Sequence, residues 1–412
     1  MSTINSIKGF KDILPADAPF WQFIEKVVRD VSRRYDFEEL RPPIAEKTEI
    51  FARGIGEATD IVEKEMYSFV DKGEERITLR PEATAGIVRS VLEHHLTAGG
   101  RAVRLFCMGP MFRYEKPQKG RQRQFHQIDV EVLGDAGPYV DVEVLSWLND
   151  FLHGLGLTGL MINLNSLGCP ECRPAFRELL VKFFTARVES LCPDCQRRLE
   201  MNPLRIIDCK NEKCREIVKD APIMLDHLCG DCTDHFNKVK ELLDLLGLKY
   251  KVNPFLVRGL DYYTRTAFEV LSDDLGSQSA VAGGGRYDGL CKELGGVDIP
   301  AIGFAIGMER LVMLLKEKAA IEAQTPDYYL AVLSEAALPV AFKLAKDLRD
   351  NGHHVAGDWE VGSLKSRMKK ADKSGAAKTI MIGDDELGRK QAVVRDMQAH
   401  EQTELDLAPY MA

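Results

Sequence analysis

The chain has 412 residues, 45% of them hydrophobic and 29% charged, which is typical of a globular protein with two or three domains. Its formal net charge of −8 argues against a broadly basic nucleic-acid binder, although one basic face on an acidic protein is enough to bind RNA. No apolar run is long enough to span a bilayer and residues 1–10 lack a secretory apolar core, so we expect a cytoplasmic protein without membrane association.

The first predicted element is an amphipathic helix that begins after Asp17, and two prolines then force extended backbone at residues 41–44. A hairpin over residues 66–80 leads into Leu79-Arg-Pro-Glu-Ala-Thr84, which is followed by apolar residues at helical spacing. Glu82 and Thr84 are therefore expected at a strand-to-helix junction. A carboxylate there can simply complement the helix dipole, or it can bind a ligand.

Polar and apolar residues alternate between residues 105 and 134, as they do in strands. Alternation predicts Arg113 and Glu115 on one face of the first strand. On the second strand it places Gln127, Asp129 and Glu131 on one face. The connecting loop, residues 116–124, is basic and rich in amides. A sheet with one wet face explains the alternation equally well, and it is the basic loop that favours a ligand site.

A helix is predicted over residues 138–152, and the composition changes after it. Eight of the 10 cysteines fall between residues 169 and 232, namely Cys169, Cys172, Cys192, Cys195, Cys209, Cys214, Cys229 and Cys232. In a cytosolic chain such clustering indicates metal binding before disulfides, and eight thiolates suffice for two structural zinc ions. Free cysteine is also a common small core residue, and the spacing alone does not fix which pairs meet. The sequence therefore assigns no metal ligand with certainty.

Residues 256–290 combine a strand-like run with a glycine run. The first half carries Arg258, Asp261 and Glu269 among apolar and aromatic residues, and three glycines precede Arg286 in the second half. A glycine run lets backbone approach a ligand closely, whereas the plain alternative is a hairpin with a bulge and surface ion pairs. Further on, residues 299–311 run from strand into helix and place Arg310 near the first turn, where the helix dipole disfavours a cation. A bound polyanion would reverse that penalty, and the plain alternative is a solvent-facing arginine paired with Glu309 or another acid.

The last segment begins after Gln324-Thr-Pro326 and alternates strands with helices, which predicts a small α/β unit. Residues 364–375 within it form a basic, helix-like run. Such a run is usually a solvated face.

Several of these segments resemble the motifs of histidyl-tRNA synthetases of bacterial type, a family of class II aminoacyl-tRNA synthetases. Leu-Val-Arg-Gly-Leu-Asp-Tyr-Tyr and Gly-Gly-Gly-Arg-Tyr-Asp-Gly resemble its two signature sequences, Phe-Arg-x-Glu with its loop resembles the second class II motif, and Gly-Met-Glu-Arg resembles the third. The resemblance covers nearly the whole chain and is weakest between residues 168 and 247. It implies a homodimer, with Pro43 near the centre of the dimer-forming first motif.

The implied fold is an α+β catalytic domain with an antiparallel sheet over residues 1–325, interrupted at about 168–247 by a Cys-rich helical insertion. The resemblance implies contact with tRNA for this insertion. A C-terminal α/β anticodon-binding domain is expected over residues 326–412.

The resemblance also implies roles for individual residues. Histidine binding is implied for Glu82, Thr84, Gln127, Glu131, Arg258, Tyr262 and Tyr263. ATP binding is implied for Arg113, Glu115, Arg121 and Arg310, and contact with the tRNA acceptor end for Gln118 and Arg123. Arg258 and Arg113 are the implied catalytic residues, because adenylation needs stabilisation of charge on phosphate oxygens and no general base.

The expected function is thus a histidine-tRNA ligase. It activates L-histidine with ATP and Mg²⁺ to histidyl-adenylate and pyrophosphate, and then transfers histidine to the 3′ end of tRNA(His); DNA is not expected as a partner. One alternative is a non-catalytic, histidine-sensing paralogue such as the regulatory subunit of ATP phosphoribosyltransferase. Another is a zinc-ribbon nucleic-acid-binding or scaffold protein built around the cysteines.

Overall fold

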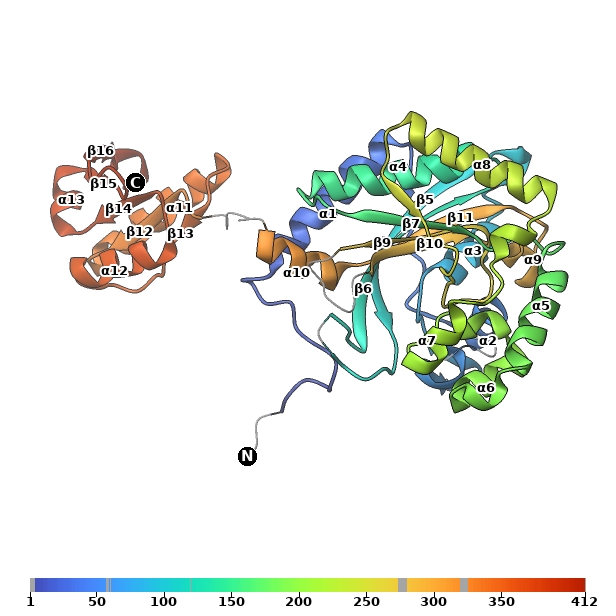
Figure 1. Ribbon diagram of the computed structural model, residues 1–412. Helices are drawn as coiled ribbons and strands as arrows, with labels where there is room; N and C mark the ends of the chain where they lie inside the picture. Colours follow the sequence, from blue (N-terminus) through green and yellow to red (C-terminus); the bar gives the residue numbers. More distant parts are fainter. Residues whose placement is uncertain are drawn as a thin grey trace. The chain divides into compact units, whose positions relative to one another are not determined.

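The computed structural model describes residues 4–56, 59, 61–118, 120–272, 280–318 and 325–411. The chain divides into two compact units, residues 1–320 and 321–412, and each contains its own sheet (Figure 1). Gln324, the first residue of the predicted boundary, lies outside the described residues, as does Lys119 of the basic loop. No helix in the described part of the chain has the length and apolar character needed to cross a membrane.

The larger unit is built on a sheet of eight strands, in the order β1-β5-β6-β11-β10-β9-β7-β8. Its strands are β1 (Glu38–Glu39), β5 (Val103–Phe112), β6 (Gln124–Leu133), β7 (Met161–Ser166), β8 (Tyr250–Val252), β9 (Thr264–Leu271), β10 (Ala280–Arg286) and β11 (Ala301–Gly307). All pairings from β5 to β7 are antiparallel, and only the outer pairs, β1 with β5 and β7 with β8, are parallel. The expected antiparallel sheet is confirmed.

Helices cover one face of this sheet. The helices of the larger unit outside the Cys-rich segment are α1 (Ala18–Arg34), α2 (Thr48–Ile55), α3 (Thr84–Glu93), α4 (Pro138–Gly154), α9 (Leu290–Glu293) and α10 (Met308–Lys318). Helix α4 lies along the sheet with α1 and α8 (Gly230–Leu245) beside it (Figure 1). Trp147 of α4 packs on Phe304 of β11 with ring centroids 5.6 Å apart. Alternation along β11 then directs Ala305 to the opposite face, which is free to form a site.

A small antiparallel sheet and α3 bring the segment around Glu82 to that opposite face. The sheet consists of β2 (Ala45–Lys47), β4 (Arg76–Leu79) and β3 (Tyr67–Val70), in that order. Helix α3 begins at Thr84, two residues after Glu82, and buries Ile87, Val88 and Val91. The predicted strand-to-helix junction is therefore present.

The Cys-rich segment leaves the sheet after β7 and returns at β8. It contains α5 (Arg173–Thr185), α6 (Pro193–Met201), α7 (Glu212–Val218) and α8 (Gly230–Leu245). Its core is formed by Phe176, Leu180 and Phe184 together with cysteine side chains. The predicted helical character of this segment is confirmed.

The smaller unit contains a five-stranded sheet in the order β13-β12-β14-β15-β16. Its strands are β12 (Tyr328–Val332), β13 (Val355–Ala356), β14 (Lys378–Ile382), β15 (Gln391–Asp396) and β16 (Gln402–Asp406), and its helices are α11 (Leu338–Asp350), α12 (Leu364–Ser374) and α13 (Asp384–Arg389). The basic run forms α12, which begins at the N-cap Ser363 and ends at Gly375 with a φ of 69°. A positive φ favours glycine there.

Two predicted strands are shorter than alternation suggested. Strand β5 ends at Phe112, so Arg113 and Glu115 follow the strand instead of lying on one of its faces; the backbone N–H of Tyr114 donates to the carbonyl of Glu65 and leaves the ladder. Strand β9 begins only at Thr264, because side chains of other elements hold the preceding residues. Asn165 donates to the carbonyl of Leu256 at 2.9 Å and Arg205 donates to that of Arg258 at 3.2 Å.

Candidate active site

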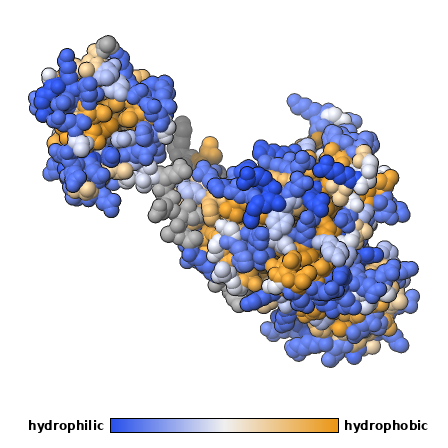
Figure 2. Space-filling model, turned by 90° about the horizontal axis from the view of Figure 1, so that it is seen from above, coloured by the Kyte–Doolittle hydropathy of each residue, from blue (hydrophilic) through white to orange (hydrophobic). Residues whose placement is uncertain are grey.

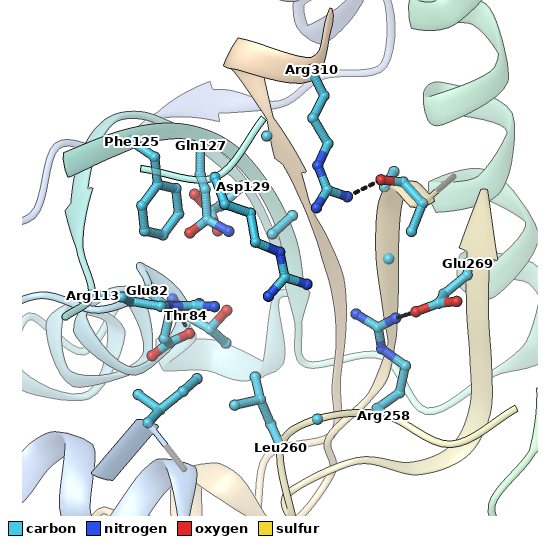
Figure 3. Close-up of a pocket in the computed structure, with 18 of the residues that line it drawn as sticks. Glu82, Thr84, Arg113, Phe125, Gln127, Asp129, Arg258, Leu260, Glu269 and Arg310 are labelled. Carbon is cyan, nitrogen blue, oxygen red and sulfur yellow. Dashed lines mark hydrogen bonds and ion pairs between the residues drawn. The ribbon is translucent and has the colours of Figure 1, made fainter. Parts of the chain in front are cut away.

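A pocket of about 330 Å³ lies on the face of the large sheet opposite α4. Strands β6, β9, β10 and β11 contribute to its lining, together with the N-terminal end of α3 and residues 258–263. Its polar lining residues include Glu82, Thr84, Arg113, Glu115, Arg121, Gln127, Asp129, Arg258, Glu269 and Arg310 (Figure 3). A volume of this size suits one small-molecule ligand or part of a larger one.

Glu82 is held at the start of α3. Its carboxylate accepts hydrogen bonds from the backbone N–H groups of Thr84 and Ala85, both at 2.9 Å. Burial raises the pKa of Glu82, and these two donors oppose that rise. The helix end thus fixes the carboxylate at the wall of the pocket.

Glu131 lies behind that wall, fully buried. It accepts hydrogen bonds from the Thr84 hydroxyl at 2.7 Å and from the Tyr287 hydroxyl at 2.5 Å. Its side chain lies over Gly303 of the paired strand β11, where any Cβ would overlap the carboxylate. Burial raises the pKa of Glu131 well above its ordinary value, and it also raises that of Tyr287.

Asp129 differs from Glu82 and Glu131 in that its completely buried carboxyl group has no hydrogen-bond partner for either oxygen among the described residues. Burial raises the pKa of Asp129 well above its ordinary value, and the neighbouring charge of Glu82 adds to the rise. The Oε1 atom of Gln127, two residues earlier, also lacks a partner in the described part of the chain. Such unsatisfied acceptors on a pocket floor suit a ligand that brings cationic or N–H donors.

Arginine side chains line the other side of the pocket. Arg258 pairs with Glu269 at 2.5 Å and lies 5.6 Å from the centroid of the Tyr263 ring. Burial works against its charge, yet Tyr263 and Glu269 together keep the pKa of Arg258 raised. Arg310, in the first turn of α10, donates to the carbonyl of Ala280. Burial lowers the pKa of Arg310 and the charge of Arg121 lowers it further, so a bound anion would stabilise this cluster.

The pocket therefore combines buried carboxyl groups on one side with converging guanidinium groups on the other, and comparison with known proteins identifies the fold that carries it. The profile "Histidyl-tRNA synthetase" matches residues 9–171 and 197–311, and the profile "Anticodon binding domain" matches residues 327–410. The chain belongs to the histidyl-tRNA synthetase family. The predicted class II fold with a C-terminal sheet-containing unit is confirmed.

Similar synthetases match the chain from end to end. Proteins named histidine--tRNA ligase from Desulfotalea psychrophila and Geobacter sulfurreducens are each 52% identical over 98% of this chain, and the matches cover 94% and 98% of those proteins. The apo histidyl-tRNA synthetase of S. aureus has a TM-score of 0.83 at 36% identity, with all of both chains covered. A Bacillus halodurans structure described as an ATP phosphoribosyltransferase regulatory subunit/histidyl-tRNA synthetase shares the fold, with a TM-score of 0.65 at 21% identity, covering 90% of this chain and 97% of that one.

Most of the residues singled out by resemblance to the synthetase family meet in the pocket. They are Glu82, Thr84, Arg113, Glu115, Arg121, Gln127, Arg258, Tyr262, Tyr263 and Arg310. Glu131 contacts Thr84 from behind the pocket wall.

Gln118 and Arg123 do not line this pocket. The Arg123 guanidinium stacks 3.7 Å from the centroid of the Tyr114 ring and donates to the carbonyl of Glu115 at 3.3 Å. Gln118 lines a second hollow instead, together with residues of the Cys-rich segment such as Asp208, Lys210 and Lys213.

Reasoning from the sequence did not select Asp129, Phe125, Glu269 or Tyr287 as site residues of the synthetase. Alternation had placed Asp129 on the same strand face as Gln127 and Glu131, and this orientation could have identified it as a site residue. Phe125 lies beneath the Arg113 guanidinium, 5.2 Å from ring centroid to Cζ. Tyr287 belongs to the signature run Gly-Gly-Gly-Arg-Tyr-Asp-Gly, but its contact with Glu131 arises only from tertiary packing.

Proposed function

We propose that this chain is a cytoplasmic, homodimeric histidine-tRNA ligase. It would join L-histidine to ATP as histidyl-adenylate and pyrophosphate, and then transfer histidine to the 3′ end of tRNA(His). The observation that carries this proposal is the arrangement of buried carboxyl groups opposite a set of arginines in a single pocket. An amino acid with a cationic end and an imidazole, next to a polyphosphate, has the complementary charge distribution.

In this proposal Glu82, Thr84 and Gln127 bind the α-ammonium group of histidine. The Glu82 carboxylate is already oriented by α3, so little side-chain entropy is lost on binding. The carboxyl oxygens of Asp129, without a partner in the described part of the chain, would accept further hydrogen bonds from the ligand.

The imidazole is read by Glu131, Tyr262 and Tyr263. Ring centroids of the two tyrosines lie 4.7 Å apart, and that of Tyr287 lies 5.6 Å from Tyr262. A wall of this kind can hydrogen-bond both ring nitrogens. A site built to satisfy a substrate N–H rejects analogues lacking it by about 10⁴-fold.

ATP is proposed to bind along Arg113, Arg121 and Arg310, with Glu115 near the adenine. The histidine carboxylate, already ionised, attacks the α-phosphorus, and pyrophosphate leaves. Arg258 and Arg113 neutralise the charge that builds on the phosphate oxygens, and Mg²⁺ arrives bound to the phosphates of ATP. The pairing of Arg258 with Glu269 fixes the guanidinium before substrate arrives, which favours catalysis by positioning.

The tRNA is proposed to contact both units. Gln118 and Arg123 of the basic loop would meet the acceptor end, and the unit comprising residues 326–412 would bind the anticodon. The basic helix α12 presents exposed Lys365, Lys369 and Lys373, which suits a phosphate backbone.

The experiment is ATP–pyrophosphate exchange with each amino acid in turn. We expect exchange with histidine alone. Arg258→Ala should slow exchange at least tenfold, and Glu131→Gln should raise the KM for histidine while leaving that for ATP within about twofold. Arg53→Ala, which removes an exposed arginine paired with Glu49, is the matched control and should change neither.

The same assay separates the proposal from its rival, since the fold is shared with a structure described as a regulatory subunit. Folded protein that binds histidine and ATP without any exchange would indicate the histidine-sensing paralogue.

A further inference from the structure

The eight cysteines of the Cys-rich segment gather into two groups of four. Cys169, Cys172, Cys229 and Cys232 form the first cluster, and Cys192, Cys195, Cys209 and Cys214 form the second. Within each cluster all Sγ atoms lie within 4.8 Å of one another. Each cluster joins two pairs of cysteines that are distant in sequence, so tertiary folding brings them together.

The sulfur separations match a tetrahedron around one metal ion. A Zn–S bond of about 2.3 Å places the corners of a regular tetrahedron about 3.8 Å apart. Three of the separations are 3.7 Å between Cys169 and Cys172, 3.8 Å between Cys169 and Cys229, and 3.8 Å between Cys192 and Cys209, and the others are within 4.8 Å. A disulfide needs a separation of about 2.05 Å, and all ten cysteines are free thiols.

Backbone geometry around the sulfurs favours thiolates. The N–H of Cys229 donates to Cys172 Sγ at 3.1 Å, and the N–H of Cys192 donates to Cys214 Sγ at 3.3 Å. Cys172, Cys192 and Cys229 are the N-cap residues of α5, α6 and α8, where the helix dipole stabilises negative charge. N–H donors of this kind orient metal ligands and offset their charge.

A role as plain core residues explains the clusters less well. Cys169, Cys192 and Cys229 are partly exposed, whereas cysteines that only fill space are usually buried. Packing alone gives no reason for the cysteines to gather in two separate sets of four.

We propose that each cluster binds one structural Zn²⁺ through four cysteine thiolates. Four-thiolate tetrahedral sites select zinc or iron among common metals, and thiolates that share a single ion lie closer together than those that surround an iron–sulfur cube. With all four positions taken by protein, neither ion has an open site for catalysis. Their work is to hold the Cys-rich segment folded.

The first cluster also adjoins the candidate active site. Arg173, next to Cys172, donates to the carbonyl of Tyr263. From the region between the second-cluster cysteines, Asn202 donates to Asp261 at 2.9 Å and Arg205 to the carbonyl of Arg258 at 3.2 Å. The zinc-held segment thereby positions residues 258–263. The zinc sites themselves do not depend on the proposed function, whereas any effect of zinc on histidine activation does.

The test is the metal content of untagged protein purified without added metal, by elemental analysis against protein concentration. Wild type should carry two zinc ions per chain. Cys169→Ser with Cys172→Ser should carry one, and so should Cys192→Ser with Cys195→Ser. The matched control, Cys107→Ser with Cys291→Ser, changes the two buried cysteines outside the clusters and should keep two.

A second measurement does not depend on the folding of any variant. Titration of wild type with a mercurial thiol reagent should release two zinc ions per chain, and Co²⁺ exchanged into the protein should show tetrahedral thiolate spectra. Absence of zinc together with no uptake of Co²⁺ by the reduced protein would overturn the proposal. Stoichiometric iron in place of zinc would overturn the metal assignment, and two zinc ions retained in either paired cluster variant would overturn that site.

Discussion

Arg286 and Asp129 are buried on opposite faces of the large sheet, and burial disfavours the charged form of both side chains. They differ in whether other side chains compensate for that burial. Arg286 is fully buried on the α4 side, where it pairs with Asp141 and donates to Asp288 at 3.1 Å. Asp141 also accepts from Thr266 at 2.6 Å and contacts His235 at 2.8 Å. Asp129, on the pocket side, has no such partners within the described residues. The satisfied network stabilises the fold, whereas the unsatisfied carboxyl group is kept for a ligand.

Asp129→Asn should therefore stabilise the free protein and weaken histidine binding. A carboxyl group whose pKa is raised in the folded state contributes stability below its unfolded pKa of about 3.9 and loses that contribution as pH rises through the folded pKa. The gain from asparagine should thus be absent at pH 3.5 and grow toward pH 8, to about 1–3 kcal/mol.

Thermal unfolding of Asp129→Asn between these pH values measures the gain, and the KM for histidine should rise at least tenfold. Asp220→Asn, an exposed aspartate of the Cys-rich segment, is the control and should shift neither quantity. A lower melting temperature for Asp129→Asn at pH 8 would contradict the argument.

Arg286→Ala should destabilise the protein by about 3–5 kcal/mol, because it leaves the buried Asp141 without its cation. Arg104→Ala, which breaks a half-exposed pair with Glu143 at 2.9 Å, should cost no more than about 1 kcal/mol. Urea unfolding followed by circular dichroism measures both. Similar losses in the two variants would show that burial is not the deciding factor.

Among the elements, β10 shows most clearly why the site needs particular residues. Gly283 pairs with Glu269 of β9, and the Arg258 guanidinium lies directly over it. A Cβ at this position would occupy the space of that guanidinium. The glycine run therefore makes room for the Arg258 side chain. It also allows a ligand to come close to the backbone.

Gly283→Ala should displace Arg258 from Glu269 and lower histidine-dependent exchange at least tenfold, which is about 1.4 kcal/mol in activation free energy. Gly388→Ala in α13 is the control, since a Cβ there would meet nothing within 4 Å. Both variants should remain folded by circular dichroism. Normal exchange by Gly283→Ala would remove Arg258 from the catalytic proposal.

Helices and strands could be predicted from the sequence where the pattern of apolar residues along one continuous stretch determines them. Periodicity located α1, α3, α4 and most strands, because each buries one face along a continuous stretch. It failed at residues 113–115 and 256–263, where hydrogen bonds from distant elements replace the strand ladder. For the same reason the sequence indicated metal-like cysteines but could not pair Cys169 with Cys229, 60 residues away.

At the scale of the whole molecule, the chain consists of two units with separate cores. The core of residues 321–412 is built from Leu330, Val332, Leu344 and Ile380, among others, all within that unit. Within the described part of the chain, the residues that line the candidate pocket belong to the first unit. Amino-acid activation and tRNA recognition should therefore be separable.

A chain ending at residue 320 should keep histidine-dependent ATP–pyrophosphate exchange within about fivefold of the full chain, because it retains the entire pocket. Its charging of tRNA(His) should fall by at least about 10²-fold, since a contact surface worth about 3 kcal/mol or more is lost. Exchange and charging assays on the same preparation check this. Proportional loss of both activities would show that the second unit supports the first.

The Cys-rich segment leaves the sheet after Ser166, the last residue of β7, and the chain returns at Tyr250, the first residue of β8, which pairs in parallel with Ile162. Cysteines from both ends of this excursion, Cys169 and Cys229, meet in the first cluster. The stretch between these two cysteines begins and ends at one place, with sulfur atoms 3.8 Å apart, so it can change length or content without changing the register of any strand. Another folded module with closely spaced termini could therefore replace the stretch between Cys169 and Cys229. Such a replacement would lose the contacts to residues 258–263.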